Sequence, residues 1–160
     1  MSAWGALAGG FAGTLVLTTM LRAASELGLT RMDIPFLLGS ALTGHREKAK
    51  VLGYLAHLLA GQAFAFVYYG LFVALGTSSW WLGSLFGALH AAFAGAVLVN
   101  VLLPVVHPRM GSGFTAAPEI ALLEPPGFML LNYGVRTPLV TVVAHVAYGA
   151  IVGAFVSFAG

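Results

Sequence analysis

Long stretches without a charged side chain set the layout of this sequence. Ser2–Leu21 and Thr137–Gly160 contain no Lys, Arg, Asp or Glu, and neither does the longer stretch Val51–Pro108. A membrane-spanning helix needs ~20 apolar residues, so the two shorter stretches each fit one span and the longer one holds two, separated by a turn at Gly76–Ser79. The pattern predicts an all-α, polytopic membrane protein folded as a bundle of four transmembrane helices. The expected spans cover about residues 3–27, 47–75, 80–106 and 138–159.

Two long connectors join the first span to the second and the third to the fourth, at residues 28–46 and 107–137. In the first connector, Asp33 precedes Ile34-Pro35 and is expected to cap a short interfacial helix. In the second connector, prolines bound a predicted short helix over residues 118–126, and the apolar segment Gly127–Val135 is too short to span, so it is interfacial or re-entrant. Residues 1–160 are therefore expected to form a single transmembrane domain.

The basic residues are distributed unevenly and predict an orientation. Lys and Arg are retained on the cytoplasmic side of a membrane, so the two long connectors are expected to be cytoplasmic and both termini periplasmic. Trp4, Trp80 and Trp81 fall at the opposite interface, where aromatic belts occur. The seven basic residues are Arg22, Arg31, Arg46, Lys48 and Lys50 in and around the first connector, and Arg109 and Arg136 in the second.

Composition excludes several classes of protein. Hydrophobic residues make up 59% of the chain and charged residues 8%, whereas a soluble domain has roughly 25% charged residues. The small formal net charge of +2 is a topology signal and not the signature of a nucleic-acid-binding surface. The chain has no Cys, which excludes disulfides, thiolate metal sites and thiol catalysis. Phosphate-binding loops, nucleophile elbows and His-Glu-x2-His zinc motifs are also absent from the sequence.

Small residues recur every four positions in three of the spans. The series are Gly5, Gly9 and Gly13, then Gly83, Gly87, Ala91 and Gly95, and finally Gly149 and Gly153. Such ridges let helix backbones approach closely, which is how helices associate within lipid. We interpret them as helix-packing surfaces. A second interpretation, which does not exclude the first, is that glycine beside a histidine makes room for a bulky cofactor.

Three histidines, His57, His90 and His145, lie inside three different predicted spans. At ~1.5 Å per residue, His57 and His90 lie roughly 15 Å from opposite interfaces and His145 roughly 10 Å from the inner one. All three are expected to meet in the middle to inner half of the bundle, each with small residues on its own helix face. Ionisable groups inside a membrane are costly and are candidates for function.

Two kinds of cofactor suit these histidines. A haem would be held between His57 and His145, which occupy matching Ala-His-x3-Gly units. Alternatively, His57, His90 and His145 would bind iron, manganese or zinc. The connector residues that could complete such a site or relay protons are Asp33, His107, Glu119 and Glu124. The simpler alternatives are histidines that hydrogen-bond between helices and connector residues that form a solvated rim.

Several short motifs give the chain a family resemblance. They are Gly-Gly-Phe-Ala-Gly-Thr-x3-Thr-x-Met at Gly9–Met20, Met-Asp-Ile-Pro-x3-Gly at Met32–Gly39, and the two His-x3-Gly units. With these motifs the chain resembles a group of small bacterial four-span integral membrane proteins of unknown function. The resemblance implies the bacterial inner (cytoplasmic) membrane and supplies no activity and no site residues.

The functional hypothesis is an integral membrane protein that holds a haem or metal ion through its intramembrane histidines, in electron transfer or a membrane oxidoreductase complex. One alternative is a non-catalytic accessory or structural subunit of a membrane complex. Another is a small transporter or channel, which with four spans would need to form oligomers. The expected partners are the lipid bilayer and either other membrane subunits or further copies of this chain, and no nucleic acid.

Overall fold

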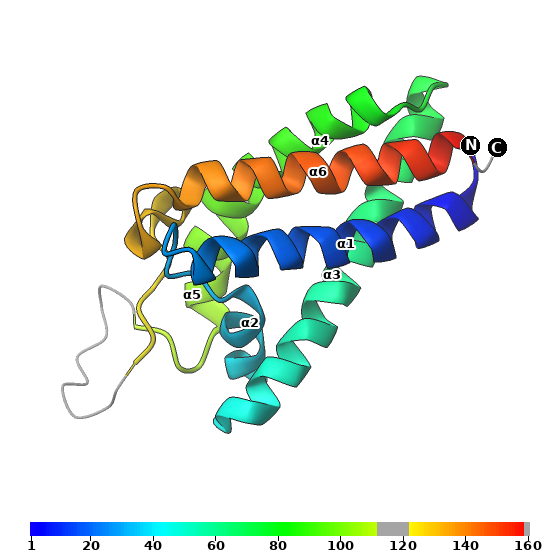
Figure 1. Cartoon of the computed structure of the whole chain (residues 1–160). Helices are drawn as coiled ribbons and strands as arrows, with labels where there is room; N and C mark the ends of the chain where they lie inside the picture. The colour runs from blue at the N-terminus through cyan, green and yellow to red at the C-terminus, as the bar shows by residue number, and fades with distance from the viewer. Residues whose placement is uncertain (112–121, 159–160) are drawn as a thin grey trace.

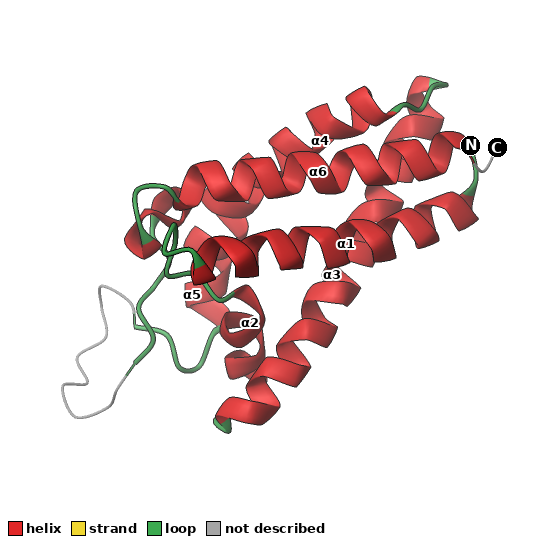
Figure 2. Cartoon of the chain, viewed as in Figure 1, coloured by secondary structure: helices red, strands yellow, loops and turns green. Residues whose placement is uncertain are grey.

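The computed structural model describes residues 1–111 and 122–158, and these residues form a helical bundle with no strand (Figures 1 and 2). Four helical segments are long and apolar enough to cross a membrane, which confirms the predicted fold class of a multi-pass membrane protein. The elements are α1 (Ala3–Glu26), α2 (Ile34–Leu42), α3 (Arg46–Leu75), α4 (Trp80–Phe93), the π-helix η1 (Ala94–Leu102), α5 (Leu103–Val106), the 3-10 helix η2 (Phe128–Tyr133) and α6 (Thr137–Phe158).

The long helices pack in the order α4, α6, α1, α3, and α2 lies against the N-terminal part of α3 (Figure 1). The backbones of α3 and α4 come close only near their shared turn, where Gly76 adopts the left-handed conformation with φ of 67°. Beyond the turn, aromatic side chains bridge the two helices. The ring centroids of Tyr68 and Phe86 lie 5.5 Å apart, and those of Phe72 and Phe86 lie 5.2 Å apart.

Glycines make the closest contacts between α4 and α6. A Cβ atom on Gly83 would overlap the carbonyl oxygen of Gly149, and one on Gly87 would overlap the carbonyl oxygen of His145. Small residues at a helix interface let the backbones approach each other in this way. The structure confirms that the Gly83–Gly95 ridge is a packing surface. Because the backbones already touch along it, this seam leaves no space for a cofactor.

The third span is not the continuous α-helix that the sequence predicts. It changes at Ala94 from α-helix to the π-helix η1 and returns to a short α-helix at Leu103. Pro104 has no N–H to donate to the preceding turn, which disturbs the regular hydrogen-bond ladder here. On the other side of η1, the sulfur and backbone of Met129 lie against Gly95. π-helical segments are uncommon and occur frequently beside functional sites.

The first connector folds as the sequence predicts. The carboxylate of Asp33 accepts a hydrogen bond from the backbone N–H of Phe36 at 3.0 Å and caps α2. α2 then packs closely on α3, where a Cβ atom on Gly53 would overlap the carbonyl oxygen of Pro35. In the second connector, residues 118–121 of the helix predicted over residues 118–126 lie outside the described residues. The described part, residues 122–126, is not helical, so the prediction is wrong there. The apolar segment that follows forms η2.

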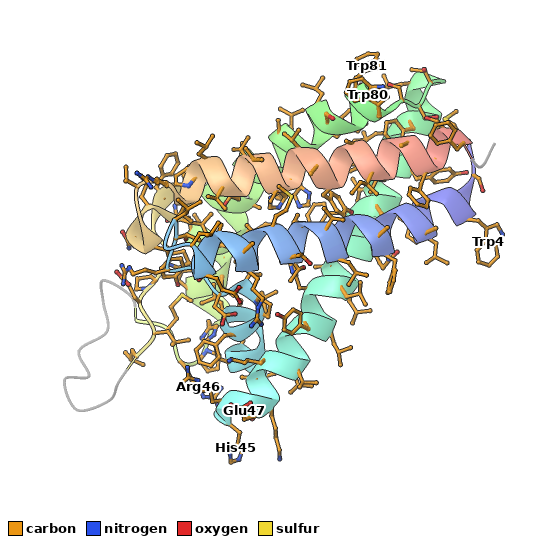
Figure 3. All side chains as sticks on the ribbon, viewed as in Figure 1. Trp4, His45, Arg46, Glu47, Trp80 and Trp81 are labelled. Atoms are coloured by element: carbon orange, nitrogen blue, oxygen red, sulfur yellow. The ribbon has the colours of Figure 1, made fainter. Side chains whose placement is uncertain are left out.

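Large apolar side chains cover the outside of the bundle, as expected for contact with lipid. Trp4, Trp80 and Trp81 are exposed and lie toward the end of the bundle where α1 begins and α6 ends (Figure 3). His45, Arg46 and Glu47 lie far from that end. The described chain therefore has an aromatic end and a charged end, which is the arrangement that a membrane-spanning bundle requires.

Candidate functional site

A cavity of about 180 Å³ lies inside the bundle, and the rings of His57, His90 and His145 all line it. α1, α3, the third span and α6 each contribute to its wall, and the cavity is partly open to the outside. Most of the remaining lining is apolar, including Phe64 and Leu98. The three histidines that the sequence places at compatible depths are thus brought to one cavity.

His57 of α3 is held by a threonine of α1. Its Nδ1 lies 3.0 Å from the Oγ1 of Thr18, and the Thr18 hydroxyl donates its hydrogen to the backbone carbonyl of Thr14 at 2.7 Å. A hydroxyl has one hydrogen to donate, so its oxygen accepts from Nδ1–H of His57. In a neutral imidazole the other nitrogen, Nε2, then carries a lone pair and acts as an acceptor.

His145 of α6 has the same tautomer for a different reason. Its Nδ1 lies 2.8 Å from the carbonyl oxygen of Thr141 in the preceding turn. A carbonyl oxygen only accepts, so Nδ1 carries the hydrogen and Nε2 is the acceptor. Neither Nε2 of His145 nor that of His57 has a hydrogen-bond partner among the described residues. The site therefore contains two unused acceptor nitrogens.

His90 of α4 has the opposite tautomer. The hydroxyl of the buried Tyr68 lies 3.2 Å from the Nδ1 of His90. Among the described residues, the Tyr68 hydroxyl has no other hydrogen-bond partner. A buried phenol must donate its hydrogen, so Nδ1 of His90 accepts and Nε2 carries the ring hydrogen. Phe64 stacks on the ring with centroids 3.7 Å apart, and the ring of His145 meets it edge-on at 4.8 Å. His90 therefore contributes a donor beside the two acceptors.

Two further polar side chains of α6 line the cavity. The Tyr148 hydroxyl donates to the backbone carbonyl of Gly61, which links the two Ala-His-x3-Gly units directly. The Thr141 hydroxyl is buried, and the structure gives it no hydrogen-bond partner. An unpaired buried hydroxyl costs roughly 1–3 kcal/mol, so a ligand that hydrogen-bonds to it would gain binding energy.

The cavity offers no charge to balance a cation. None of its described lining residues is Asp, Glu, Lys or Arg. Within residues 1–111 and 122–158, no group of three His, Asp or Glu side chains is arranged to hold one metal ion. A divalent ion bound by neutral imidazoles alone would leave its charge uncompensated inside the membrane, which is unfavourable. The electrostatics of the cavity favour a neutral ligand.

The volume of the cavity also limits the size of the ligand and is relevant to the haem hypothesis. A cavity of about 150 Å³ in another protein is large enough to bind benzene. The present cavity, at about 180 Å³, holds about one six-membered ring with a small substituent. A haem macrocycle is much larger, so it does not fit between His57 and His145 in this arrangement of the helices.

His107, which the sequence analysis considers as a ligand or as part of a solvated rim, is a structural residue. It is only 4% exposed, so the rim interpretation is wrong for it. Its Nδ1 accepts from the backbone N–H of Arg109 at 3.1 Å, and its Nε2 lies 3.1 Å from the carbonyl oxygen of Leu37. These bonds attach the end of the third span to α2.

Of the candidate carboxylates, Asp33 and Glu124 lie in the described part of the chain, and neither lines the cavity. Asp33 caps α2, and Glu124 pairs with Arg31 at 3.2 Å between their side-chain atoms. Glu119 lies outside the described residues. The Tyr133 hydroxyl donates to the backbone carbonyl of Glu124 at 2.8 Å, and burial, with a smaller contribution from the Glu124 charge, raises the pKa of Tyr133 to about 12.

Sequence reasoning missed the side chains that orient the histidines. Thr18 belongs to the Gly9–Met20 motif, but that motif assigns it no role, and Tyr68 and Thr141 belong to no motif. Each is recognisable as a site residue only because the fold brings its oxygen to the cavity or to an imidazole. One weak signal was present, since Thr141 precedes His145 by one helical turn and lies on the same helix face, although His57 and His90 do not bond to their preceding turns.

Comparisons with known proteins assign no family. No protein-family model, no curated protein and no solved structure matches this chain. Function therefore has to be argued from the cavity and the side chains that line it.

Proposed function

We propose that this protein binds a small, neutral, lipid-soluble molecule in the cavity lined by His57, His90 and His145. The observation that supports this most directly is a cavity with an apolar wall, three convergent imidazoles and no Asp, Glu, Lys or Arg among its described lining residues. Sites for small molecules commonly combine an apolar lining with a few convergent polar groups that set orientation. The expected setting is a membrane oxidoreductase or electron-transfer complex, where lipid-soluble cofactors are used.

Binding of a simple apolar probe tests the proposal. Toluene should raise the melting temperature of the purified protein in detergent. Occupancy at ten times the dissociation constant stabilises by about 1.4 kcal/mol, which is roughly 3–5 °C for a chain of this size. Ala94→Phe should abolish the shift because Ala94 lines the cavity. Ala92→Phe, which adds the same ring to an exposed position of the same span, should keep it and corrects for toluene in the micelle.

Equal shifts in the two variants would contradict ligand binding in the cavity. The histidines would then serve only to join helices, and the protein would be an accessory or structural subunit, the alternative from the sequence. A transporter or channel function has less support, because the lining of the histidine cavity is mostly apolar and its described part has no charged side chain.

A transition-metal site is the second candidate function. Metal-binding histidines usually donate one ring N–H to a neighbouring oxygen and bind the ion with the other nitrogen. His57 and His145 show this arrangement, with Thr18 and Thr141 as the oxygen partners. Iron, manganese or zinc would require the rings to move together and an anion to enter. Elemental analysis together with an optical spectrum distinguishes the classes, because stoichiometric metal supports this candidate and a Soret band supports haem.

The proposed location is the bacterial inner membrane, with both termini periplasmic. The support is the uneven distribution of Lys and Arg along the sequence, together with the separation of Arg46 from the three tryptophans in Figure 3. The chain has no Cys, so single cysteines report orientation without interference. Ser78→Cys should react with a membrane-impermeant reagent in intact spheroplasts, and His45→Cys should react only after lysis. The reverse pattern would contradict the orientation.

A further inference from the structure

We propose that the ligand of the histidine cavity is an alkylated phenol or an alkylated hydroquinone. The cavity recognises it by the hydroxyl group on its ring. This inference rests on the proposed function and specifies the class of ligand. Its basis is the distribution of hydrogens over the three imidazoles and the shape of the cavity.

The hydroxyl group follows from the hydrogen-bond partners of the rings. His57 and His145 use their Nδ1–H groups on Thr18 and Thr141 and leave two acceptor nitrogens. His90 accepts from Tyr68 and leaves an N–H donor. A ligand hydroxyl is a donor and an acceptor at once, so it can donate to an acceptor nitrogen while it accepts from His90. A ketone or an ether can use only the donor and leaves both acceptor nitrogens unpaired.

The unpaired hydroxyl of Thr141 supports a polar group at this place. It lines the cavity and has no partner in the described structure. Buried polar groups are nearly always hydrogen-bonded, so an unpaired one inside a cavity indicates where a ligand atom belongs. The Thr141 hydroxyl can accept from the ligand or donate to it, so it marks the position of a polar ligand atom, and the two acceptor nitrogens decide that this atom carries a hydrogen.

The aromatic ring follows from the walls and the volume. Phe64 and Tyr148 line the cavity, and Phe64 stacks with His90. Aromatic side chains pack favourably with a further ring in stacked or edge-on contacts. The volume of about 180 Å³ suits one ring, and the partly open side of the cavity gives an alkyl substituent a way out of it. The described lining has no charged side chain to attract a carboxylate or an amine.

Four aromatic probes separate the contribution of the ligand hydroxyl to binding from that of the ring. They are 4-ethylphenol, its methyl ether 4-ethylanisole, the ketone 4-methylacetophenone, and toluene. Affinities for the full-length protein in detergent are corrected for the measured partition of each probe into micelles. 4-Ethylphenol should bind at least about tenfold more tightly than the ether and the ketone, because a site built for a hydroxyl rejects analogues that lack it. Equal affinities, or tighter binding of the ketone, would overturn the inference.

Thr18→Val tests whether the tautomer carries the selectivity. Without the Thr18 oxygen, His57 is free to move its hydrogen to Nε2, so the preference for the phenol should fall about threefold to tenfold while toluene binding is retained. Thr19→Val is the matched control, because Thr19 is exposed on the same turn and does not line the cavity. A phenol preference that survives unchanged in Thr18→Val would contradict the role given to His57.

Nitrogen-15 NMR of labelled histidine gives a readout that needs no ligand. His57 and His145 should show the Nδ1–H tautomer and His90 the Nε2–H tautomer. A different pattern would overturn the inference, whatever binds. The failures remain distinguishable, because the absence of toluene binding removes the proposed function and this inference together. Toluene binding without a preference for the phenol removes the inference alone.

Discussion

α4, α6 and α1 are joined by glycines that bring their backbones into contact, whereas α3 stands away from α4 and is connected to it by large aromatic side chains. The cavity with its histidines lies between the two sides, because α1, the third span and α6 line it together with α3. Close packing inside a membrane depends on backbone approach, so a helix pair without facing glycines keeps room between its backbones. The comparison indicates that the cavity results from an uneven distribution of small residues over the helix pairs.

Gly87→Leu should have the largest effect. A side chain at this position meets the carbonyl oxygen of His145, so α4 and α6 must separate. We expect a loss of at least about 3 kcal/mol, the upper end of the cost of overpacking, or failure to fold. The control is Gly70→Leu on α3, where a Cβ atom meets nothing within 4 Å. Thermal unfolding in detergent measures both variants, and equal melting temperatures would show that the glycine seam is not what holds this side together.

Tyr68→Phe should have an intermediate effect on the aromatic-bridged side. It retains the packing of the ring and removes the hydroxyl that donates to His90. We expect a loss of about 1 kcal/mol, the typical net value of one hydrogen bond. Tyr69→Phe is the matched control, because Tyr69 is the next residue of α3 and its hydroxyl makes no hydrogen bond within the described part of the chain. No difference between the two variants in thermal unfolding would argue against the Tyr68–His90 bond.

Ala94→Leu should change the free energy of unfolding less than Tyr68→Phe does, although it enlarges the side chain. Ala94 lines the cavity, so the added atoms enter existing space and the free energy of unfolding should change by less than about 1 kcal/mol. The comparison with Gly87→Leu is direct, because both substitutions lie on the third span. A collapse of stability in Ala94→Leu would mean that the cavity is not available to a ligand.

The smallest expected effect concerns the charged end of the bundle, where Tyr133 joins η2 to Glu124. Its pKa is raised from 10.0 to about 12, first by burial and then by Glu124. The folded state therefore keeps the proton when the unfolded state loses it, so this contribution is complete below pH 10 and declines as the pH rises from 10 toward 12. Tyr133→Phe should remove that part of the decline in stability above pH 10. An unchanged profile would show that other groups cause it.

The positions of the elements could be predicted from the sequence because their causes are local. The uncharged stretches predicted the four spans, and Asp33 before Ile34-Pro35 predicted the cap of α2. The Gly83–Gly95 series predicted a helix-packing surface. The π-helical segment was not predicted. Pro104 follows the segment closely, but Met129 contacts it at Gly95, and that contact joins residues far apart in the chain.

The site was predictable only in its histidines. An ionisable residue inside an apolar span is visible in the sequence, and its depth follows from helix geometry, so three histidines could be expected at one level. The partners of the histidines could not be found in this way. The contact of Thr18 with His57 and that of Tyr68 with His90 each join two different helices and follow from how those helices rotate and cross.

By itself the sequence determined that the chain spans a membrane four times, because the transfer of each segment into lipid depends on that segment's own composition. Tertiary structure decided which ring nitrogen of each intramembrane histidine carries the hydrogen. The hydrogen on an imidazole goes to whichever nitrogen has an acceptor nearby, and those acceptors come from neighbouring turns and helices. Packing also set the size of the cavity, because it depends on which helix pairs bring glycines face to face and which keep aromatic side chains between them.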